Sequence, residues 1–304
     1  MLHMTDIAAG AWAASLTPLN DDLSVDYAAL AAHVRWLLAE GAGGVAVLGT
    51  TGEANSFSVA ERLDLIGSLA KAGFPPERIV IGTGCCAAPD TIALTRAALE
   101  AGFPNVMMLP PFYYKIVSEE GLFQAFARAI EAVNDPRLRV IIYDFPLMTG
   151  LTLSTALLVR LRAAFPETVI GVKNSSGDWR AMEDALAQMP GFQVFAGTEQ
   201  FLLPTLRAGG PGCISATANV TIGKLAKLAA AWREPRADVL QDAATSARLS
   251  LQSFPAIPAL KEMMAHASGR AAWRNVRPPL VNLNVAQRTE VLALAKTLDL
   301  SLPA

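Results

Sequence analysis

Residues 78–110 read RIVIGTGCCAAPDTIALTRAALEAGFPNVMMLP and contain two short apolar runs on either side of a longer amphipathic segment. The runs, 78–84 and 105–110, are mostly continuous rather than alternating, which is typical of strands buried on both faces of a parallel sheet. The segment 89–102 between them has apolar residues at the three- and four-residue spacing of a helix and ends at a glycine. The stretch therefore predicts a strand, a crossover helix and a second, parallel strand.

The same alternation extends over most of the chain. We expect strands over 9–16, 43–49, 78–84, 105–110, 139–145, 169–173, 192–197 and 212–217. Helical patterns cover 26–41, 58–73, 89–102, 118–133, 154–165, 178–189 and 199–210. Ser58 and Glu61 form a capping box at the start of the second pattern, and Pro204 should kink or shorten the last.

Eight strands that alternate with helices predict an α/β fold, a (β/α)₈ TIM barrel. An open doubly wound sheet is the alternative, but no Gly-x-Gly-x-x-Gly motif follows the first strand. Residues 220–304 hold helix patterns and no clear strand. We therefore assign residues 1–219 to a barrel that carries the active site and residues 220–304 to a C-terminal helical extension.

Composition narrows the class of protein. The 304 residues are 52% hydrophobic, and 25 basic and 27 acidic residues give a net charge of −2 without a charged block. Nothing therefore indicates binding to nucleic acid or to an anionic membrane. The N-terminal residues lack the pattern of a signal peptide, no apolar run could span a bilayer, and the three cysteines and three scattered histidines fit neither a disulfide framework nor a metal site. We expect a cytoplasmic protein.

Polar residues collect where the predicted strands end, which is where barrel enzymes place their chemistry. These segments are GTTGE at 49–53, PPFYY at 110–114, YDFP at 143–146, KNS at 173–175 and ISAT at 214–217. Each has an ordinary structural interpretation: a tight turn, a packed tyrosine, or a lysine with its charge in water. Glu53 is best interpreted as an anchor of its turn. A barrel would bring all these strand ends to one face, which favours a functional site.

These motifs occur together, and in order, in one known family. The chain resembles the dihydrodipicolinate synthase/N-acetylneuraminate lyase family of pyruvate-dependent class I aldolases. The resemblance covers essentially the whole chain. It rests on GTTGE at 49–53, YY at 113–114 with EEGL at 119–122, YDFP with a following TG at 143–150, VKNSSGD at 172–178, GCISATANV at 212–220, PAIPALKEMM at 255–264 and RPPL at 277–280.

The resemblance implies a set of catalytic residues. Lys173 matches the lysine that forms a Schiff base with a 2-keto acid, and burial at an apolar strand end would favour its neutral, nucleophilic form. Tyr143 matches the tyrosine that passes protons to and from the imine and the substrate oxygen. Thr50 matches the threonine that links this tyrosine to a second one. Tyr114 matches that second tyrosine, which reaches into the neighbouring active site across a dimer interface.

The resemblance also implies how the substrate is bound. Thr51, in the turn that begins with Gly49, matches the site that holds the substrate carboxylate, because such turns present N–H groups to anions. Ile214 matches a residue whose backbone carbonyl lies in the pyruvate pocket. The family needs no metal and no organic cofactor, and it forms homodimers or tetramers of dimers.

Two departures from the family pattern bear on the substrate. Met148 stands where dihydrodipicolinate synthases carry an arginine that pairs with the carboxylate of aspartate semialdehyde, and methionine cannot make that charge-assisted bond. Asp144 stands where asparagine is common. We therefore expect a Schiff-base lyase or aldolase that cleaves, forms or dehydrates a 2-keto-3-deoxy acid, with pyruvate as one component.

Three other functions stay open. The first is 4-hydroxy-tetrahydrodipicolinate synthase, which Met148 disfavours. The second is a non-catalytic paralogue that binds a keto acid, which the joint presence of the proton-relay residues disfavours. The third is a phosphate-handling barrel isomerase, but its glycine-rich candidate, 208–212, precedes the eighth strand and should lie at the wrong end of the barrel.

Overall fold

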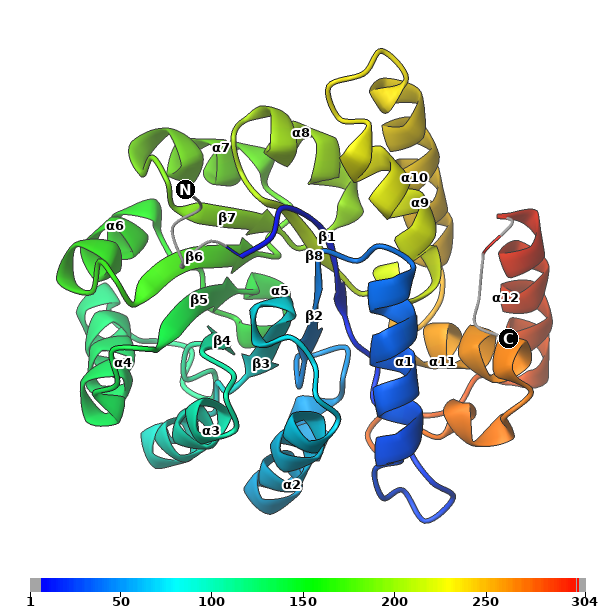
Figure 1. Ribbon diagram of the computed structural model, residues 1–304, viewed down its shortest axis with the longest axis horizontal. Helices are drawn as coiled ribbons and strands as arrows, with labels where there is room; N and C mark the ends of the chain where they lie inside the picture. Colours follow the sequence, from blue (N-terminus) through cyan, green and yellow to red (C-terminus); the bar gives the residue numbers. More distant parts are fainter. Residues whose placement is uncertain (1–6, 299, 301–304) are drawn as a thin grey trace.

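Eight parallel strands close into a barrel in the computed structural model, which describes residues 7–298 and 300 (Figure 1). Each strand pairs with the next in the chain, and β1 also pairs with β8, so the predicted (β/α)₈ barrel is confirmed. The strands are β1 (Gly10–Ala14), β2 (Gly44–Val47), β3 (Ile79–Gly82), β4 (Asn105–Met108), β5 (Arg139–Asp144), β6 (Val169–Asn174), β7 (Gln193–Ala196) and β8 (Gly212–Ser215). Seven of the eight predicted strands contain the observed one, and β6 extends one residue past its predicted end at Lys173.

Helices follow the strands and surround the barrel (Figure 1). They are α1 (Tyr27–Ala39), α2 (Val59–Lys71), α3 (Ala88–Glu100), α4 (Glu119–Val133), α5 (Pro146–Thr149), α6 (Thr155–Ala164), α7 (Trp179–Gln188), α8 (Leu202–Arg207), α9 (Ala218–Ala230), α10 (Ala237–Leu251), α11 (Ala256–Ser268) and α12 (Val285–Thr297). Short 3₁₀ turns are η1 (Ala54–Ser56), η2 (Pro76–Arg78), η3 (Glu199–Phe201) and η4 (Ala271–Arg274). Among the described residues, no helix is both long and apolar enough to cross a membrane.

Local signals account for where several helices begin. Ser58 Oγ accepts the Glu61 N–H and the Glu61 carboxylate accepts the Ser58 N–H, so the predicted capping box is confirmed. The pattern over 199–210 becomes the turn η3 and the short helix α8. Pro204 lies in the first turn of α8, where a missing N–H costs no intrahelical bond. The four-residue helix α5 was not predicted.

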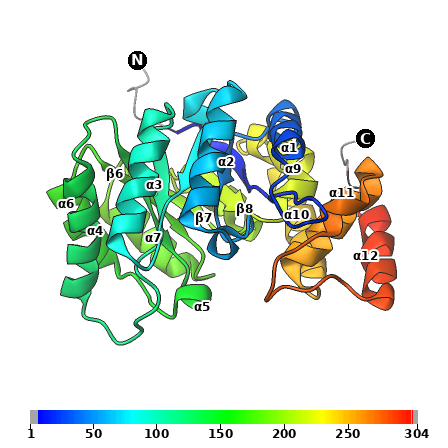
Figure 2. The same cartoon turned by 90° about the horizontal axis from the view of Figure 1, so that it is seen from below.

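The division between barrel and extension needs a different position from the one drawn at residues 219 and 220. That position falls in the first turn of α9, which packs against β1 as the eighth helix of the barrel. We propose that the extension begins after Ala230. It has its own apolar core, built from α11 and α12 around residues such as Met263 and Val291, and this core also contacts Leu16 and Val220 of the barrel. Figure 2 shows α11 and α12 at one side of the barrel.

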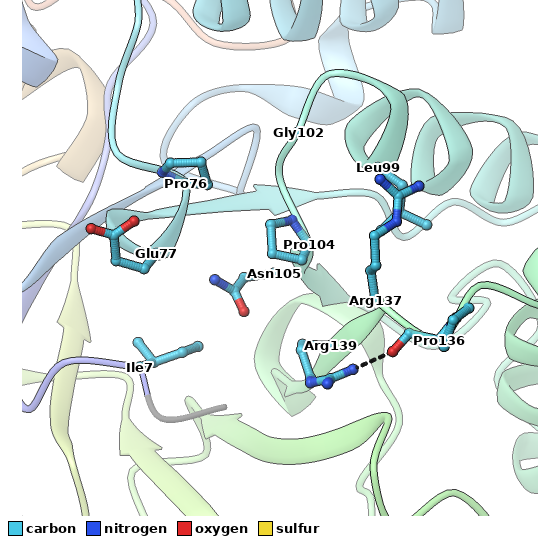
Figure 3. Close-up of a pocket in the computed structure, with 10 residues that line it drawn as sticks. All are labelled: Ile7, Pro76, Glu77, Leu99, Gly102, Pro104, Asn105, Pro136, Arg137 and Arg139. Atoms are coloured by element: carbon cyan, nitrogen blue, oxygen red, sulfur yellow. Dashed lines mark hydrogen bonds between the residues drawn. The ribbon is translucent and has the colours of Figure 1, made fainter. Parts of the chain in front are cut away.

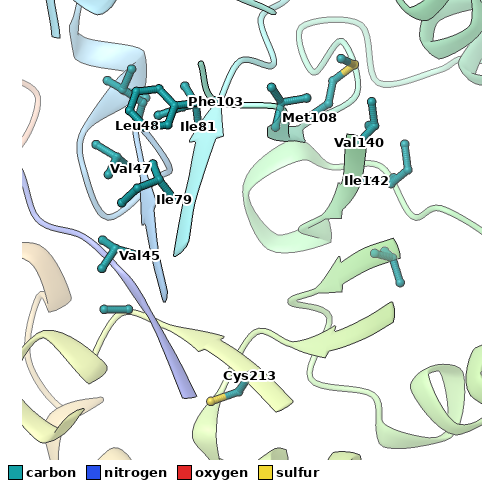
Figure 4. Packing of buried hydrophobic residues seen from close by; sticks show 14 of the residues in the cluster. Val45, Val47, Leu48, Ile79, Ile81, Phe103, Met108, Val140, Ile142 and Cys213 are labelled. Carbon is teal, nitrogen blue, oxygen red and sulfur yellow. The ribbon is translucent and has the colours of Figure 1, made fainter. Parts of the chain in front are cut away.

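Alternation along the strands separates two layers of core. Side chains such as Val45, Ile79 and Ile142 point outward and pack under the helices (Figure 4). Their neighbours, including Val80 and Ile141, point inward and fill the barrel. Because successive residues of a strand face opposite sides, the inward positions at the carboxyl ends of the strands are where side chains can reach a central site.

Candidate active site

A cavity of about 370 Å³ opens at the carboxyl ends of the barrel strands. Its walls come from the ends of β2, β5, β6, β7 and β8 and from α10 and α11 of the extension. This is the end of the barrel at which the predicted polar segments were expected to meet.

A second cavity, of about 410 Å³, lies at the opposite end of the barrel (Figure 3). Its lining includes Asn105 and Arg139, the first residues of β4 and β5, together with Pro76 and Glu77 from the turn before β3. None of the predicted site residues lines it. Because residues at this end of a parallel barrel serve stability rather than chemistry, we place the candidate active site in the first cavity.

An irregularity in β6 turns Lys173 into the barrel. Val140 of β5 pairs with Val169, whereas its neighbour Ile141 pairs with Gly171, so one residue of β6 is left over. Val169 packs under the outer helices, and strict alternation from it would put Lys173 on the same outer face. The bulge reverses the alternation, as bulges near active sites do.

Lys173 lines the cavity and is only 4% exposed. It pairs in register with Tyr143 on one side and with Phe195 on the other, and its Nζ lies 4.2 Å from the centroid of the Tyr143 ring. No ion pair to Lys173 occurs in the part of the chain that the structure describes. The side chain therefore does not extend into bulk water, which removes the ordinary interpretation of a solvated strand-end lysine.

Five other predicted residues line the same cavity. Tyr143 and Ile214 are buried inside the barrel, and Thr50 and Thr51 follow β2. Met148, on α5, is 56% exposed at the mouth. The cavity thus brings together residues more than 160 positions apart in the sequence, because the barrel places the ends of distant strands around one opening.

Gly49 and Tyr114 do not line this cavity. Gly49 lies on a small adjoining cavity together with Thr50 and Tyr143. Tyr114 is 71% exposed, and its ring contacts that of Tyr113 edge-on with centroids 5.3 Å apart. A role for Tyr114 in this site therefore requires a second subunit.

The loop that carries Thr50 and Thr51 is anchored from the extension. Glu53 adopts a left-handed backbone conformation with φ 58° and is buried. Its carboxylate pairs with Lys261 of α11 and accepts a hydrogen bond from the backbone N–H of Arg277 at 2.9 Å. This geometry agrees with the interpretation of Glu53 as an anchor of the turn.

One wall of the cavity contains polar residues that sequence analysis missed. This polar wall consists of Ser176, Thr198, Gln200, Arg248 and Gln252. The first three follow β6 and β7, whereas the last two lie on and just after α10. No Asp or Glu is among the described lining residues, so Lys173 and Arg248 are the only basic or acidic side chains there. The segment of α10 gave no signal because its position beside the barrel is a property of the tertiary structure.

A buried carboxylate supports the ends of β7 and β8. Glu199 is fully buried and accepts hydrogen bonds from Ser215 Oγ, at 2.5 Å, and from Thr217 Oγ1. Gln241 of α10 donates to the Glu199 carbonyl at 2.9 Å. The network ties α10 to the strands that form the cavity, and both oxygens of the Glu199 carboxylate accept a hydrogen bond within it.

Asp144 has a buried carboxyl group, and burial disfavours its ionised form. It is 2% exposed, and burial raises its pKa from 3.8 to about 6, against the opposing hydrogen bond from the Leu153 N–H at 3.2 Å. A raised folded-state pKa means that the fold prefers the neutral acid: there is no penalty below pH 4, and the cost grows between pH 4 and 6 and is full above pH 6. Asp144→Asn should therefore raise the free energy of unfolding at pH 8 by about 2–3 kcal/mol.

Urea unfolding at pH 4 and pH 8 checks this expectation. The gain of Asp144→Asn at pH 8 should shrink to about 0.5 kcal/mol at pH 4, where the aspartate is protonated in the folded state and about 40% protonated in the unfolded chain. Asp242→Asn, on the exposed face of α10, is the matched control and should change stability by less than about 0.5 kcal/mol at either pH. An equal gain at both pH values for Asp144→Asn would show that the charge is not the cause.

No cluster of three or more His, Cys, Asp or Glu side chains that could hold a metal ion occurs in residues 7–298 and 300. The chemistry that the cavity can supply from its own residues is that of an amine, a phenol, hydroxyls and a guanidinium. A buried amine beside a phenol suits capture of a carbonyl followed by proton transfer.

Comparison with known proteins agrees with this geometry. A sequence model of the dihydrodipicolinate synthetase family matches residues 8–298. A relative from Chloroflexus aurantiacus, described as an uncharacterized DapA-like lyase, is 34% identical over 285 residues, which covers 91% of this chain and 93% of the relative.

Solved structures give the same result. Dihydrodipicolinate synthase from Agrobacterium tumefaciens superposes with a TM-score of 0.88 at 34% identity, over 95% of this chain and 99% of that one. YagE, a prophage protein of the dihydrodipicolinic acid synthase family from E. coli K12 whose structure contains pyruvate, gives a TM-score of 0.88 at 27% identity, over 97% of this chain and all of that one. With a family match along nearly its whole length and relatives above 30% identity, the chain belongs to the dihydrodipicolinate synthetase family and is an enzyme of the class I aldolase and lyase type.

Proposed function

We propose that this enzyme forms a Schiff base with a 2-keto-3-deoxy acid and cleaves or forms it, with pyruvate as one component, or dehydrates it through the same enamine. The observation that carries the proposal is the position of Lys173, buried beside Tyr143 and without an ion-pair partner in the described residues. The pyruvate bound to the related YagE supports the choice of a keto acid.

The proposed reaction begins at Lys173. Its neutral amine attacks the keto carbon, and the carbonyl oxygen leaves as water, which gives a protonated imine. In cleavage, the C3–C4 bond breaks, its electron pair moves toward the imine as an enamine, and the proton of the C4 hydroxyl passes to a base as the aldehyde departs. Protonation at C3 and attack of water on the imine then release pyruvate and restore the amine.

Tyr143 is proposed as the group that accepts and returns these protons, with Thr50 as its neighbour in a relay to Tyr114. The turn of Gly49, Thr50 and Thr51 is proposed to hold the carboxylate next to the keto carbon. Burial of Tyr143 and its place beside Lys173 on paired strands support this assignment. Ile214, which lines the same cavity, is proposed to place its backbone carbonyl in the pyruvate pocket.

Tyr114 supports a proposal about assembly. The loop after β4 and the helix α5 expose several apolar side chains, namely Tyr113, Tyr114, Ile116, Leu147 and Met148. Lys115 Nζ joins the two segments by donating to the Thr149 carbonyl at 2.7 Å. An exposed apolar patch of this kind beside an active site suits an interface with a second copy that exchanges Tyr114. A monomer in sedimentation equilibrium at micromolar concentration would contradict this proposal.

Met148 argues against 4-hydroxy-tetrahydrodipicolinate synthase as the function. Its thioether cannot form a charge-assisted bond with the carboxylate of aspartate semialdehyde. Efficient condensation of pyruvate with aspartate semialdehyde would overturn this argument and make that synthase the better assignment.

Borohydride trapping tests the proposed function. Incubation of the wild-type enzyme with pyruvate and borohydride should add one reduced pyruvyl group, located by peptide mass spectrometry on Lys173. A panel of 2-keto-3-deoxy acids, sialic acid, and aspartate semialdehyde with pyruvate should then identify substrates that release or consume pyruvate. Absence of an adduct at saturating pyruvate sinks the proposal. An adduct without turnover on any member favours the keto-acid-binding paralogue.

A further inference from the structure

Arg248 is a charged side chain that lines the cavity but has no role in the proposed Schiff-base reaction. It lies near the end of α10 and lines the same cavity as Lys173. Its Nε is shielded from solvent and has no hydrogen-bond partner among the described residues, and no ion pair to Arg248 occurs in that part of the chain. A guanidinium is always charged, and a buried donor without an acceptor is costly.

The ionisable side chains of one sign dominate the cavity lining. The described lining residues include two basic side chains, Lys173 and Arg248, and no carboxylate. The buried carboxylate near the ends of β7 and β8, that of Glu199, is already occupied by Ser215 and Thr217. Conversion of Lys173 to an imine still leaves a cationic nitrogen. The wall therefore suits a substrate that carries more than one negative charge.

Arg248 reaches the cavity from a different side than the family position at Met148. Met148 belongs to α5, directly after β5, whereas α10 packs against η3 and α8, which follow β7. Lys173 comes from the carboxyl end of β6 and Arg248 from the extension, so a substrate bound at Lys173 can extend across the cavity toward Arg248. At about 370 Å³ the cavity is near the small end of ligand sites, which suits a short acid with both ends bound.

We propose that Arg248 binds a second, distal carboxylate, and that the substrate is a short 2-keto dicarboxylic acid. This inference rests on the proposed function and adds the substrate class. The planar guanidinium can hold a carboxylate through two parallel N–H···O bonds. Thr198, Gln200 and Gln252 of the polar wall offer hydrogen bonds to hydroxyl groups on the carbons between the two ends.

Aspartate semialdehyde also carries a distal carboxylate, but it fits this wall less well. Its ammonium group would meet the guanidinium of Arg248 and the cationic imine formed at Lys173, and no carboxylate on the described lining. A buried ammonium without a counter-charge is strongly disfavoured. The charge pattern therefore favours a diacid without an amino group.

Two five-carbon keto acids of matched length test the inference. 2-Oxoglutarate ends in a carboxylate and 2-oxopentanoate ends in a methyl group, and each is trapped with borohydride over a range of concentrations and measured by intact mass. In the wild-type enzyme the half-saturating concentration for 2-oxoglutarate should be about 10- to 100-fold lower than for 2-oxopentanoate. In Arg248→Met this ratio should fall below about threefold, and Arg248→Lys, which keeps the charge but loses the fork, should be intermediate.

Arg236→Met is the matched control. Arg236 lies at the start of the same helix, is exposed and pairs with Glu234 at 2.7 Å, so its replacement should keep the wild-type ratio. Pyruvate is trapped in parallel with the wild-type enzyme. Absence of a pyruvate adduct overturns the proposed function itself. Two results would overturn the role of Arg248 and leave the proposed function in place. In the first, pyruvate forms an adduct but the wild-type enzyme binds the two five-carbon acids equally well. In the second, Arg248→Met keeps the full wild-type preference for 2-oxoglutarate.

Discussion

Replacement of Lys173 by alanine is expected to abolish the borohydride-stable adduct with pyruvate and to lower kcat/KM on a keto-acid substrate by on the order of 10⁴-fold or more. The covalent imine is the electron sink for every later step, and no other lysine lines the cavity in the described residues. Tyr143 and the threonines of the loop would remain, but without the imine they have no developing charge to stabilise. Intact mass after trapping and steady-state kinetics measure the two effects.

Two further variants make this result specific. Lys173→Arg keeps a cation of similar length but offers no free base, because a guanidinium is never deprotonated in proteins, and it should be as inactive as Lys173→Ala. Lys227→Ala, on the exposed side of α9, removes a lysine away from the cavity and should react like the wild type. An adduct of full intensity in Lys173→Ala would assign the Schiff base to a different lysine.

The strands and most helices could be predicted because their signals are local. The run 139–145 contains the continuous apolar stretch 140–143, and Ser58 with Glu61 marks a helix start within four residues. The limits of the prediction were also local: a helical pattern over 199–210 reads through η3, because apolar spacing does not distinguish a 3₁₀ turn from the first turn of a helix. The predicted boundary at 219 and 220 does not take account of α9, which spans both positions and packs against β1.

The site was less predictable, since its residues meet only through tertiary structure. Lys173 points inward because of a bulge in β6, and nothing in VIGVK reveals which residue is extra. Gly171 is a sequence feature that accompanies the bulge. A Cβ at this position would lie 2.3 Å from the Gln193 carbonyl oxygen, so only glycine fits. Arg248 lies 75 residues after Lys173 in a helix that looks ordinary, and its place in the cavity depends on how α10 packs on α8 and η3.

Replacement of Lys261 by methionine is expected to destabilise the protein by about 3–5 kcal/mol and to slow catalysis together with it. The side chains of Lys261 and Glu53 are fully buried against each other, and burial lowers the pKa of Lys261 while Glu53 opposes that shift. Methionine fills much of the same space but leaves the Glu53 carboxylate with the Arg277 N–H as its remaining partner. Urea unfolding at pH 7 measures the loss.

The double variant Lys261→Met/Glu53→Gln separates two contributions to the loss of stability. One is the loss of the ion pair, and the other is the cost of leaving the buried Glu53 carboxylate charged and unpaired. Glutamine keeps an acceptor for the Arg277 N–H and carries no charge, so the double variant should recover at least half of the stability that Lys261→Met loses. Because Glu53 ends the turn that holds Thr50 and Thr51, a shift of about 1 Å in that turn should cost Lys261→Met on the order of 100-fold in kcat/KM. Recovery of stability without recovery of activity in the double variant would indicate that the ammonium of Lys261, not only the neutralisation of Glu53, holds the turn in its catalytic position. A double variant as unstable as Lys261→Met would contradict the electrostatic explanation and assign the loss to packing around α11.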